Sequence, residues 1–193
     1  MYTEQVSSNI EDCKVIYSYR GDELRHNIEP FISKNFHKAY KAKITRFAEI
    51  IIACKDYDGK YITTLGISRL DDKKKSFVES YLPRSIENEI TWLVKKPILR
   101  SQIFEISNLS SSQKGATREI IKRSVPILNS LGVKWVFFSA TKVVFNAFLK
   151  EGLKPIFLAD ALEEKIMSFK PHADWGKYYS TRPKVYCLEV PSQ

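Results

Sequence analysis

The sequence contains little cysteine and little histidine, with three of each in 193 residues. The cysteines are Cys13, Cys54 and Cys187, and the histidines are His26, His37 and His172. An odd number of widely spaced cysteines, without a Cys-x-x-Cys pair, excludes a disulfide scaffold and fits core thiols in a reducing compartment. The histidines lack the spacing of metal ligands. The sequence therefore predicts neither a disulfide framework nor a metal site.

Long apolar runs are also missing. No run approaches the roughly 18 apolar residues that cross a bilayer as a helix. Residues 1–20 contain acidic side chains and no apolar stretch typical of a signal peptide. There is no Ser-His-Asp or Gly-x-Ser-x-Gly phrase of a hydrolase, no internal repeat and no low-complexity linker. We therefore expect one domain over residues 1–193, no transmembrane segment and a cytoplasmic location.

Positive charge is in excess, because 31 Lys and Arg face 22 Asp and Glu, which gives a net charge of +9. Such a surface favours anionic partners: phosphate-bearing cofactors, acidic proteins, nucleic acid or anionic lipid headgroups. No nucleic-acid-binding motif is present, so nucleic acid is not the expected partner.

The first half of the chain has the pattern of antiparallel strands with two helices. Asp58-Gly59 is a hairpin turn signal between two β-rich stretches. Pro30 suits the first turn of a helix, and Ser85 precedes apolar residues at helical spacing. The predicted elements are strands at 13–19, 47–55, 60–70 and 77–82, and helices at 28–40 and 85–94.

The second half alternates strand and helix. The nearly all-apolar stretch at 133–140 predicts a strand buried on both faces and paired in parallel with the strand before the intervening helix. Pro126 predicts a kink in that helix. The predicted elements are strands at 103–109, 133–140 and 184–190, helices at 115–131 and 142–151, and a short helix after residue 160. The pattern therefore predicts an α/β fold with a mixed central sheet flanked by helices.

The junction at 104–118 is the most distinctive local feature, because an apolar strand enters a hydroxyl-rich turn that opens a basic helix. Backbone N–H groups at a helix N-terminus lack intrahelical partners and attract anions. The predicted anion-binding residues are Ser110, Ser111, Ser112, Lys114, Gly115, Ala116 and Arg118. Alternatively, the three serines only cap the helix.

Seven short motifs, spread in order over nearly the whole chain, resemble the thermostable hemolysin family. They are Phe-Ala-Glu at 47–49, Phe-Val-Glu-Ser-Tyr-Leu at 77–82, Glu-Ile-Ser-Asn-Leu at 105–109, Gly-Ala-Thr-Arg at 115–118, Phe-Ser-Ala-Thr at 138–141, Asn-Ala-Phe at 146–148 and Ala-Asp-Trp-Gly-Lys-Tyr-Tyr at 173–179. That family is similar to the GCN5-related N-acetyltransferase (acyl-CoA N-acyltransferase) fold. The Glu-Ile-Ser-Asn phrase is also similar to the Glu-x-Ser-Arg phrase of acyl-homoserine-lactone synthases, which take acyl chains from acyl carrier protein.

The resemblance implies a GCN5-related acyltransferase-like domain. It would move an acyl group from a CoA or acyl-carrier-protein thioester to a small amine-bearing acceptor, and a long acyl chain would make the product lipid-like. The thioester is a co-substrate, its phosphates would bind the glycine-containing turn, and no tightly bound cofactor is implied. Three positions depart from the pattern. Ser112 and Thr117 occupy the first and last places of the phosphate loop, and Phe148 stands where many such enzymes have a tyrosine acid. Tyr178, Tyr179 or water would replace that acid.

Acyl transfer also needs a base for the amine. Glu105 and Glu79 are the candidates, because each lies among apolar residues, where desolvation raises the pKa of a carboxyl. Alternatively, either side chain points to solvent or pairs with a lysine. Asn108 either orients a substrate or hydrogen-bonds a strand bulge. The aromatic segment at 174–179 either closes over a pocket or packs against the sheet.

Two basic stretches, at 34–46 and 114–123, are candidates to dock an acidic carrier protein, and otherwise form solvated helix faces. The rival to an enzyme is a hemolysin that acts directly on membranes without catalysis. No amphipathic pore hairpin or long exposed apolar helix is evident in the sequence, so a lipid product is the preferred explanation of any membrane effect.

Overall fold

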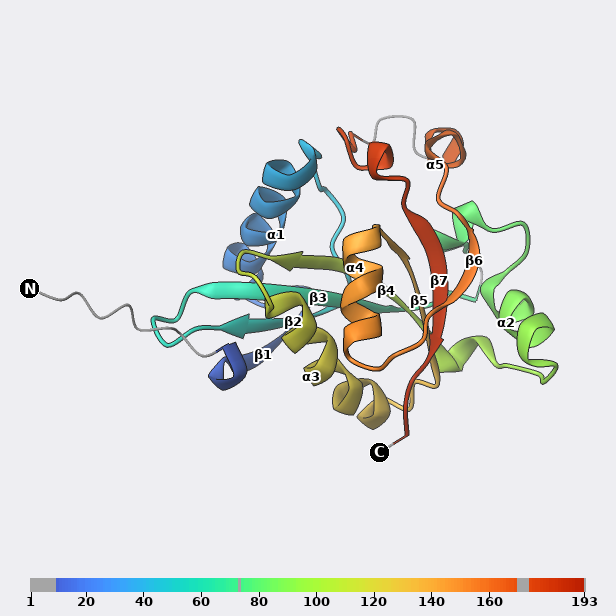
Figure 1. Cartoon of the computed structure of the whole chain (residues 1–193), viewed down its shortest axis with the longest axis horizontal. Helices are drawn as coiled ribbons and strands as arrows, with labels where there is room; N and C mark the ends of the chain where they lie inside the picture. The colour runs from blue at the N-terminus through green and yellow to red at the C-terminus, as the bar shows by residue number, and fades with distance from the viewer. Residues whose placement is uncertain (1–9, 73, 170–173, 193) are drawn as a thin grey trace, which may run out of the picture.

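The computed structural model describes residues 10–72, 74–169 and 174–192, so His172 and Ala173 lie outside the described residues. Its centre is a seven-stranded sheet with the order β1-β2-β3-β4-β5-β7-β6 (Figure 1). Neighbouring strands are antiparallel except for β4 and β5, which are parallel. The predicted mixed sheet is therefore confirmed. The strands are β1 (Lys14–Tyr19), β2 (Ile50–Lys55), β3 (Tyr61–Arg69), β4 (Ile103–Ser111), β5 (Trp135–Ala140), β6 (Ile156–Asp160) and β7 (Lys184–Glu189).

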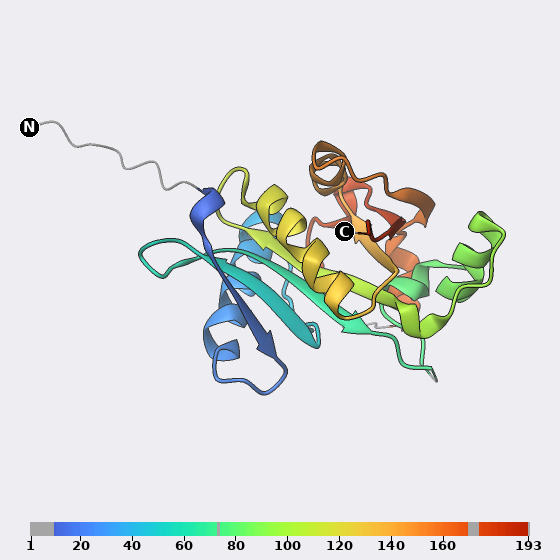
Figure 2. The same ribbon diagram turned by 90° about the horizontal axis from the view of Figure 1, so that it is seen from below.

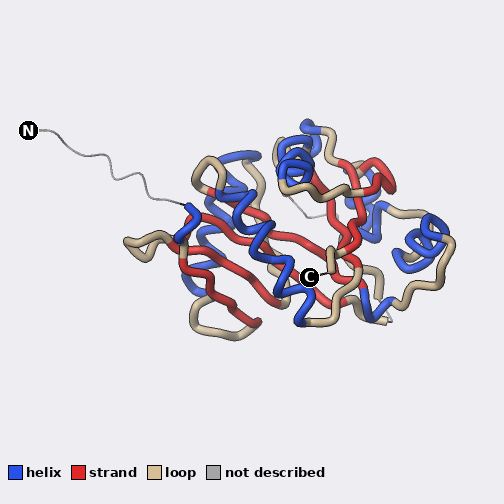
Figure 3. The backbone as a smooth tube through the Cα atoms, turned by 60° about the horizontal axis from the view of Figure 1, so that its bottom comes forward, coloured by secondary structure: helices blue, strands red, loops and turns tan. Residues whose placement is uncertain are grey.

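Helices cover both faces of this sheet, as the tube and the turned ribbon show (Figures 2 and 3). On one face, Ile120 and Leu128 of α3 and Phe148 of α4 share a core with the sheet. On the other face, Ile28 of α1 and Ile86 of α2 bury further apolar residues against it. The helices are α1 (Arg25–Tyr40), α2 (Ile86–Val94), α3 (Ala116–Ser130), α4 (Lys142–Lys150) and α5 (Glu163–Phe169).

Strand β5 explains why the sheet needs two layers of helices. Val136 and Phe138 point into the core under α3 and α4, whereas Trp135 and Phe137 point into the core under α2 and α5. Successive side chains of a strand point to opposite faces, so a continuous apolar run is buried only between two layers.

Strands β4 and β5 are paired over a short distance only. Their register covers Ile103–Glu105 of β4 and Trp135–Phe137 of β5, and no pairing between them follows in the described strands. Further along β4, the register against β3 shifts between Thr64 and Gly66, and Asn108 has a positive φ of 49°. This β-bulge bends β4. The two central strands therefore diverge toward their carboxyl ends and leave space between them.

Several predicted elements differ from the structure. Residues 77–82 are not a strand, because Val78–Tyr81 form the 3-10 helix η2. Its Glu79 carboxylate accepts hydrogen bonds from the backbone N–H groups of Ser76 and Ile86, which favours a turn over an extended chain. Strand β6 was not predicted, because it is a short edge strand. The predicted strand at 47–55 begins only at Ile50, and α3 continues through Pro126.

The three cysteines are free and buried, as predicted. Among the helices of the described residues, none has the length and apolar content needed to span a membrane. The same part of the chain holds no group of three or more His, Cys, Asp or Glu side chains arranged for a metal ion.

Candidate active site

A cavity of about 1380 Å³ opens where β4 and β5 diverge. Its wall contains residues 105–109 of β4, residues 138–141 at the end of β5, Val144 and Phe148 of α4, and the segment 43–49 that leads into β2. Because β4 lacks a β5 partner beyond Glu105, backbone polar groups on that edge face the cavity side without a strand to bind. Ligand pockets typically measure about 300–1,000 Å³, so the cavity can hold more than one small substrate.

Glu105 is a buried carboxyl in the cavity wall, with 8% of its surface exposed. Its Oε2 accepts a hydrogen bond of 3.0 Å from the backbone N–H of Val78. Burial raises the pKa of this carboxyl, while Ser76, the Val78 amide and the charge of Arg46 partly oppose the rise. A carboxyl with a raised pKa beside a substrate-sized cavity has the properties of a general base.

Glu79 has a different environment. It is fully buried, and Arg100 donates to both of its oxygens at 2.7 and 2.8 Å. Burial raises the pKa of this carboxyl, but the hydrogen bonds from Arg100 and from the amides of Ser76 and Ile86 outweigh it and leave the pKa below its usual value. Glu79 is absent from the cavity wall. The Glu79 side chain therefore has a structural position, because its hydrogen bonds connect η2 to the start of α2.

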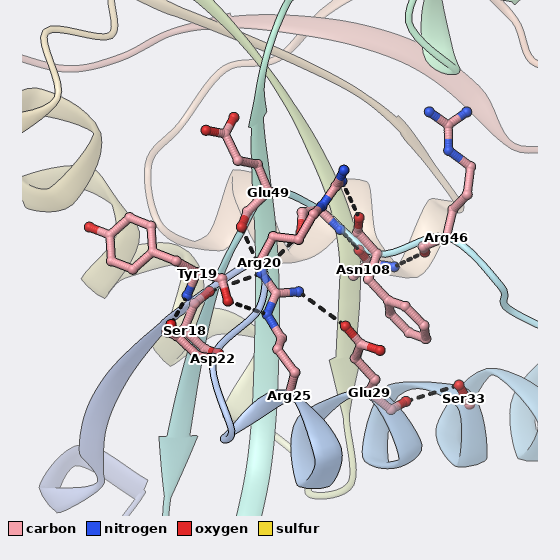
Figure 4. A network of polar contacts seen from close by, with 12 residues as sticks. Ser18, Tyr19, Arg20, Asp22, Arg25, Glu29, Ser33, Arg46, Glu49 and Asn108 are labelled. Atoms are coloured by element: carbon pink, nitrogen blue, oxygen red, sulfur yellow. Dashed lines mark hydrogen bonds and ion pairs between the residues drawn. The ribbon is translucent and has the colours of Figure 1, made fainter.

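The Asn108 side chain holds a neighbouring segment of backbone. Its Oδ1 accepts from the N–H of Ala48 at 2.8 Å, and its Nδ2 donates to the carbonyl of Arg46 at 3.2 Å (Figure 4). Its own carbonyl accepts from the Thr64 hydroxyl at 2.9 Å. Asn108 therefore hydrogen-bonds at the strand bulge, which is the second of its two predicted roles. Its side chain holds residues 46–48 beside the cavity.

Arg25 fixes the same segment from the opposite side, and no pattern in the sequence predicts this contact. It is 6% exposed, and its Nη2 donates to the carbonyls of Ala48 and Glu49 at 3.0 and 2.7 Å (Figure 4). The same guanidinium binds the carbonyls of Ser18 and Tyr19 at the end of β1. A buried cation is stable when such acceptors surround it.

In the predicted anion-binding turn, the three serines are not arranged as expected for anion ligands, because they belong to β4 or bond other protein groups. Ser110 and Ser111 belong to β4; Ser110 is buried and its hydroxyl has no hydrogen-bond partner in the described part of the chain, while the Ser111 hydroxyl bonds those of Thr63 and Thr117 at 2.8 Å. The N–H of Ser112 donates to the carbonyl of Ile62 at 2.9 Å. None of these serines caps α3 through its side chain.

The part of the turn with backbone N–H groups open to an anion is shorter than the predicted segment 110–118. Gly115, with φ of 90°, directly precedes Ala116, the buried first residue of α3. Within the described residues, the N–H groups of Lys114, Gly115 and Thr117 have no hydrogen-bond acceptor. The Lys114 residue is exposed and forms no ion pair with any residue that the structure describes, whereas Arg118 is paired with Glu151. These amides and Lys114 are the groups available to an anion.

Of the two tyrosines considered as the acid for the thiolate, Tyr178 lines the cavity and Tyr179 does not. The Tyr178 hydroxyl lies 3.3 Å from that of Ser139 in the cavity wall, and burial raises its pKa. The Tyr179 hydroxyl is 2.6 Å from that of Tyr81, and neither residue lines the cavity. Phe148 stacks on Phe138 with ring centroids 4.5 Å apart.

The aromatic segment at 174–179 both packs and lines the cavity. Trp175 lies 5.2 Å from Phe77 and 5.7 Å from Tyr178, measured between ring centroids, and all three line the cavity. The two alternatives for this segment are therefore not exclusive, since its aromatic side chains are themselves part of the wall.

Comparisons with known proteins place the fold. A family model described as thermostable hemolysin matches residues 18–193. No curated protein gives a significant match in sequence. The AHL synthase LasI superposes with a TM-score of 0.59 at 14% identity, covering 93% of this chain and 91% of LasI. FeeM, an N-acyl amino acid synthase from uncultured soil microbes, superposes with a TM-score of 0.56 at 10% identity, covering 94% and 93%.

A putative phosphinothricin N-acetyltransferase superposes with a TM-score of 0.55 at 12% identity, covering 93% of this chain and all of that protein. At such low identity these likenesses concern the fold alone. They confirm the predicted acyltransferase-like architecture.

Proposed function

This chain belongs to the thermostable hemolysin family, and we propose that it is an acyltransferase that moves an acyl group from a CoA or acyl-carrier-protein thioester to an amine. The observation that carries the proposal is Glu105, a buried carboxyl with a raised pKa in the wall of a large cavity between β4 and β5. The neighbours add support, because LasI and FeeM are named as an AHL synthase and an N-acyl amino acid synthase.

In the proposed reaction, Glu105 takes a proton from the ammonium form of the acceptor. The free amine attacks the thioester carbonyl, and backbone N–H groups on the open edge of β4 stabilise the oxyanion that forms. The carbon–sulfur bond then breaks as the amide forms, and the second amine proton goes to the departing thiolate. Tyr178, which lines the cavity and whose hydroxyl lies 3.3 Å from that of Ser139, or a water molecule carries that proton.

We assign the donor phosphates to Lys114, Gly115 and the open amides before α3. The serines contribute less than their number indicates, because the Ser111 and Ser112 hydroxyls bond other protein groups. For a carrier protein docking at 114–123, Lys114 and Lys122 form no ion pair with the described residues, whereas Arg118 and Arg123 are paired with glutamates. Charge of this kind steers an acidic partner more than it adds affinity.

The size and lining of the cavity favour a donor with more than an acetyl group. Aromatic and aliphatic side chains from α1, β4, β5 and α4 form much of its wall, among them Phe36, Ile106, Phe138 and Phe148. Each buried methylene contributes about 0.8 kcal/mol, so an apolar wall of this extent discriminates by chain length.

The proposal is tested with acyl-CoA donors of two to sixteen carbons and the matching acyl carrier proteins, each incubated with a mixture of amines and analysed by mass spectrometry. We expect donor-dependent amide products and a rise in melting temperature with the preferred donor, because binding to the native state stabilises it. The rival, direct membrane action, is tested on liposomes without donor. Lysis there, together with no amide product, would overturn the proposal.

A further inference from the structure

The cavity wall carries an excess of positive charge, with six Lys and Arg side chains against the four carboxylates of Glu49, Asp71, Glu105 and Asp174. Arg20, Arg46, Arg69, Lys74 and Lys75 all line it. Among the described residues none of the five forms an ion pair, whereas Lys43 in the same wall is paired with Asp174. Figure 4 shows the guanidinium of Arg46 extending away from the network that holds its backbone. Unpaired cations around a substrate cavity attract an anionic group of the ligand.

The backbone at Arg46 is held in place by buried polar side chains. Asn108 donates to the Arg46 carbonyl, and the same amide side chain accepts from the N–H of Ala48. Arg25 binds the carbonyls of Ala48 and Glu49 from below. Two buried polar side chains therefore fix the chain on this side of the cavity, which keeps the origin of the Arg46 side chain in one position.

Arg46 and Glu105 present opposite charges to the same space. Burial dominates the pKa of Glu105, and the charge of Arg46 is near enough to oppose that effect. Within the described residues, however, no ion pair joins the two side chains. A ligand with both an ammonium and an acidic group can therefore lie between them.

The donor phosphates do not account for this charge. They are assigned to the turn after Ser111, at the carboxyl end of β4. In the register of β3 against β4, Arg69 lies opposite Phe104, near the other end of β4. Seven residues of strand separate the two ends, which is about 23 Å at about 3.3 Å per residue. The cations at the Arg69 end of the cavity are therefore left for the second substrate, and Arg46, whose carbonyl binds Asn108, lies between that end and the turn.

We propose that the amine acceptor carries an acidic group, a carboxylate or a phosphate, and that Arg46 binds this group while Glu105 faces the amine. The inference rests on the proposed acyl transfer and adds the chemical class of the acceptor. Arg46 selects the acceptor and takes no part in the proton transfer.

The test compares amines that differ only in the acidic group. Phenylalanine is paired with 2-phenylethylamine, and O-phosphoethanolamine with ethanolamine, each with the preferred acyl donor. We expect the wild-type protein to acylate one acid-bearing amine with a kcat/KM at least about tenfold above its neutral partner, because a charge-assisted hydrogen bond is lost in the latter. The two pairs distinguish a carboxylate from a phosphate.

Arg46→Gln should remove this preference by raising KM for the acid-bearing amine about tenfold or more, with little change for the neutral one. Arg46→Lys should restore part of it. Lys96→Gln is the control, because Lys96 is exposed, lies outside the cavity wall and both basic stretches, and forms no ion pair with the described residues. Equal acylation of neutral and acid-bearing amines would overturn the inference and leave acyl transfer intact. Failure to acylate any amine would overturn the proposed function itself.

Discussion

The ion pair between Arg100 and Glu79 is predicted to be a major source of stability. The side chains are 14% and 1% exposed, and two hydrogen bonds of 2.7 and 2.8 Å join them. Arg100→Met leaves the Glu79 carboxylate buried with two amide donors but no counter-charge. Breaking a buried pair from one side costs about 3–5 kcal/mol, so we expect a loss in this range at pH 7.

The loss should depend on pH. In the wild type the pKa of Glu79 is lowered, so its contribution is fully present above the unfolded pKa of about 4.3 and disappears as pH falls through the folded value. In Arg100→Met, burial no longer has an opposing cation and raises the pKa of Glu79. The variant then gains stability by protonation as pH falls, and the difference from the wild type should shrink between pH 7 and pH 5.

Urea unfolding followed by circular dichroism at the two pH values measures this difference. Glu79→Gln combined with Arg100→Met should be more stable than Arg100→Met alone, because the fully buried charge of Glu79 is gone, while Glu87, the second partner of Arg100 at 2.7 Å, is unpaired in both variants. Lys60→Met is the surface control: Lys60 and Asp58 form an ion pair in which the side chains are 75% and 74% exposed, so we expect a loss of about 0–1 kcal/mol. A loss below about 1 kcal/mol for Arg100→Met, or one that is equal at both pH values, would refute the reasoning.

Two further predictions concern the cavity. A methyl group at Gly66 would lie 2.6 Å from Cβ of Ala48 and 3.1 Å from both Asn108 Oδ1 and the Ser107 carbonyl, so Gly66→Ala should cost about 1–3 kcal/mol and lower the melting temperature, and Ala48→Gly in the same chain should restore part of the loss. The rescue failing would show that the contact is not the cause. Tyr178→Phe should lower kcat of acyl transfer if its hydroxyl protonates the thiolate, whereas Tyr179→Phe, which removes the partner of Tyr81 outside the cavity, should lower stability and leave kcat unchanged. Equal kcat values for both variants would assign the proton to water.

The alternation of strand and helix after residue 103 was predictable because local patterns determine it. The apolar run at 133–140 required burial on both faces, and parallel pairing with β4 followed from the helix between them. Glu105 was predictable as a candidate for the same reason, since a carboxylate within an apolar strand has few ways to reach water.

The contacts that shape the site were not predictable, because they join residues far apart in the chain. Arg100 lies 21 residues from Glu79, and nothing near Glu79 in the sequence distinguishes it from Glu105. Arg25 and Asn108 act on backbone carbonyls and amides of residues 46–49, which leave no trace in side-chain patterns. The serines after β4 resembled anion ligands, but tertiary partners such as Thr63 use their hydroxyls.

The central claim is that Glu105 is the base of an acyl transfer in the β4–β5 cavity, and the most direct test is kcat/KM against pH for the wild type and Glu105→Gln. Glutamine keeps an acceptor for the Val78 amide, so the variant should fold. We expect wild-type activity to rise with pH through the raised pKa of Glu105, and the variant to lose this rise and fall by about a hundredfold to ten-thousandfold. An unchanged pH profile with full activity in Glu105→Gln would contradict the account.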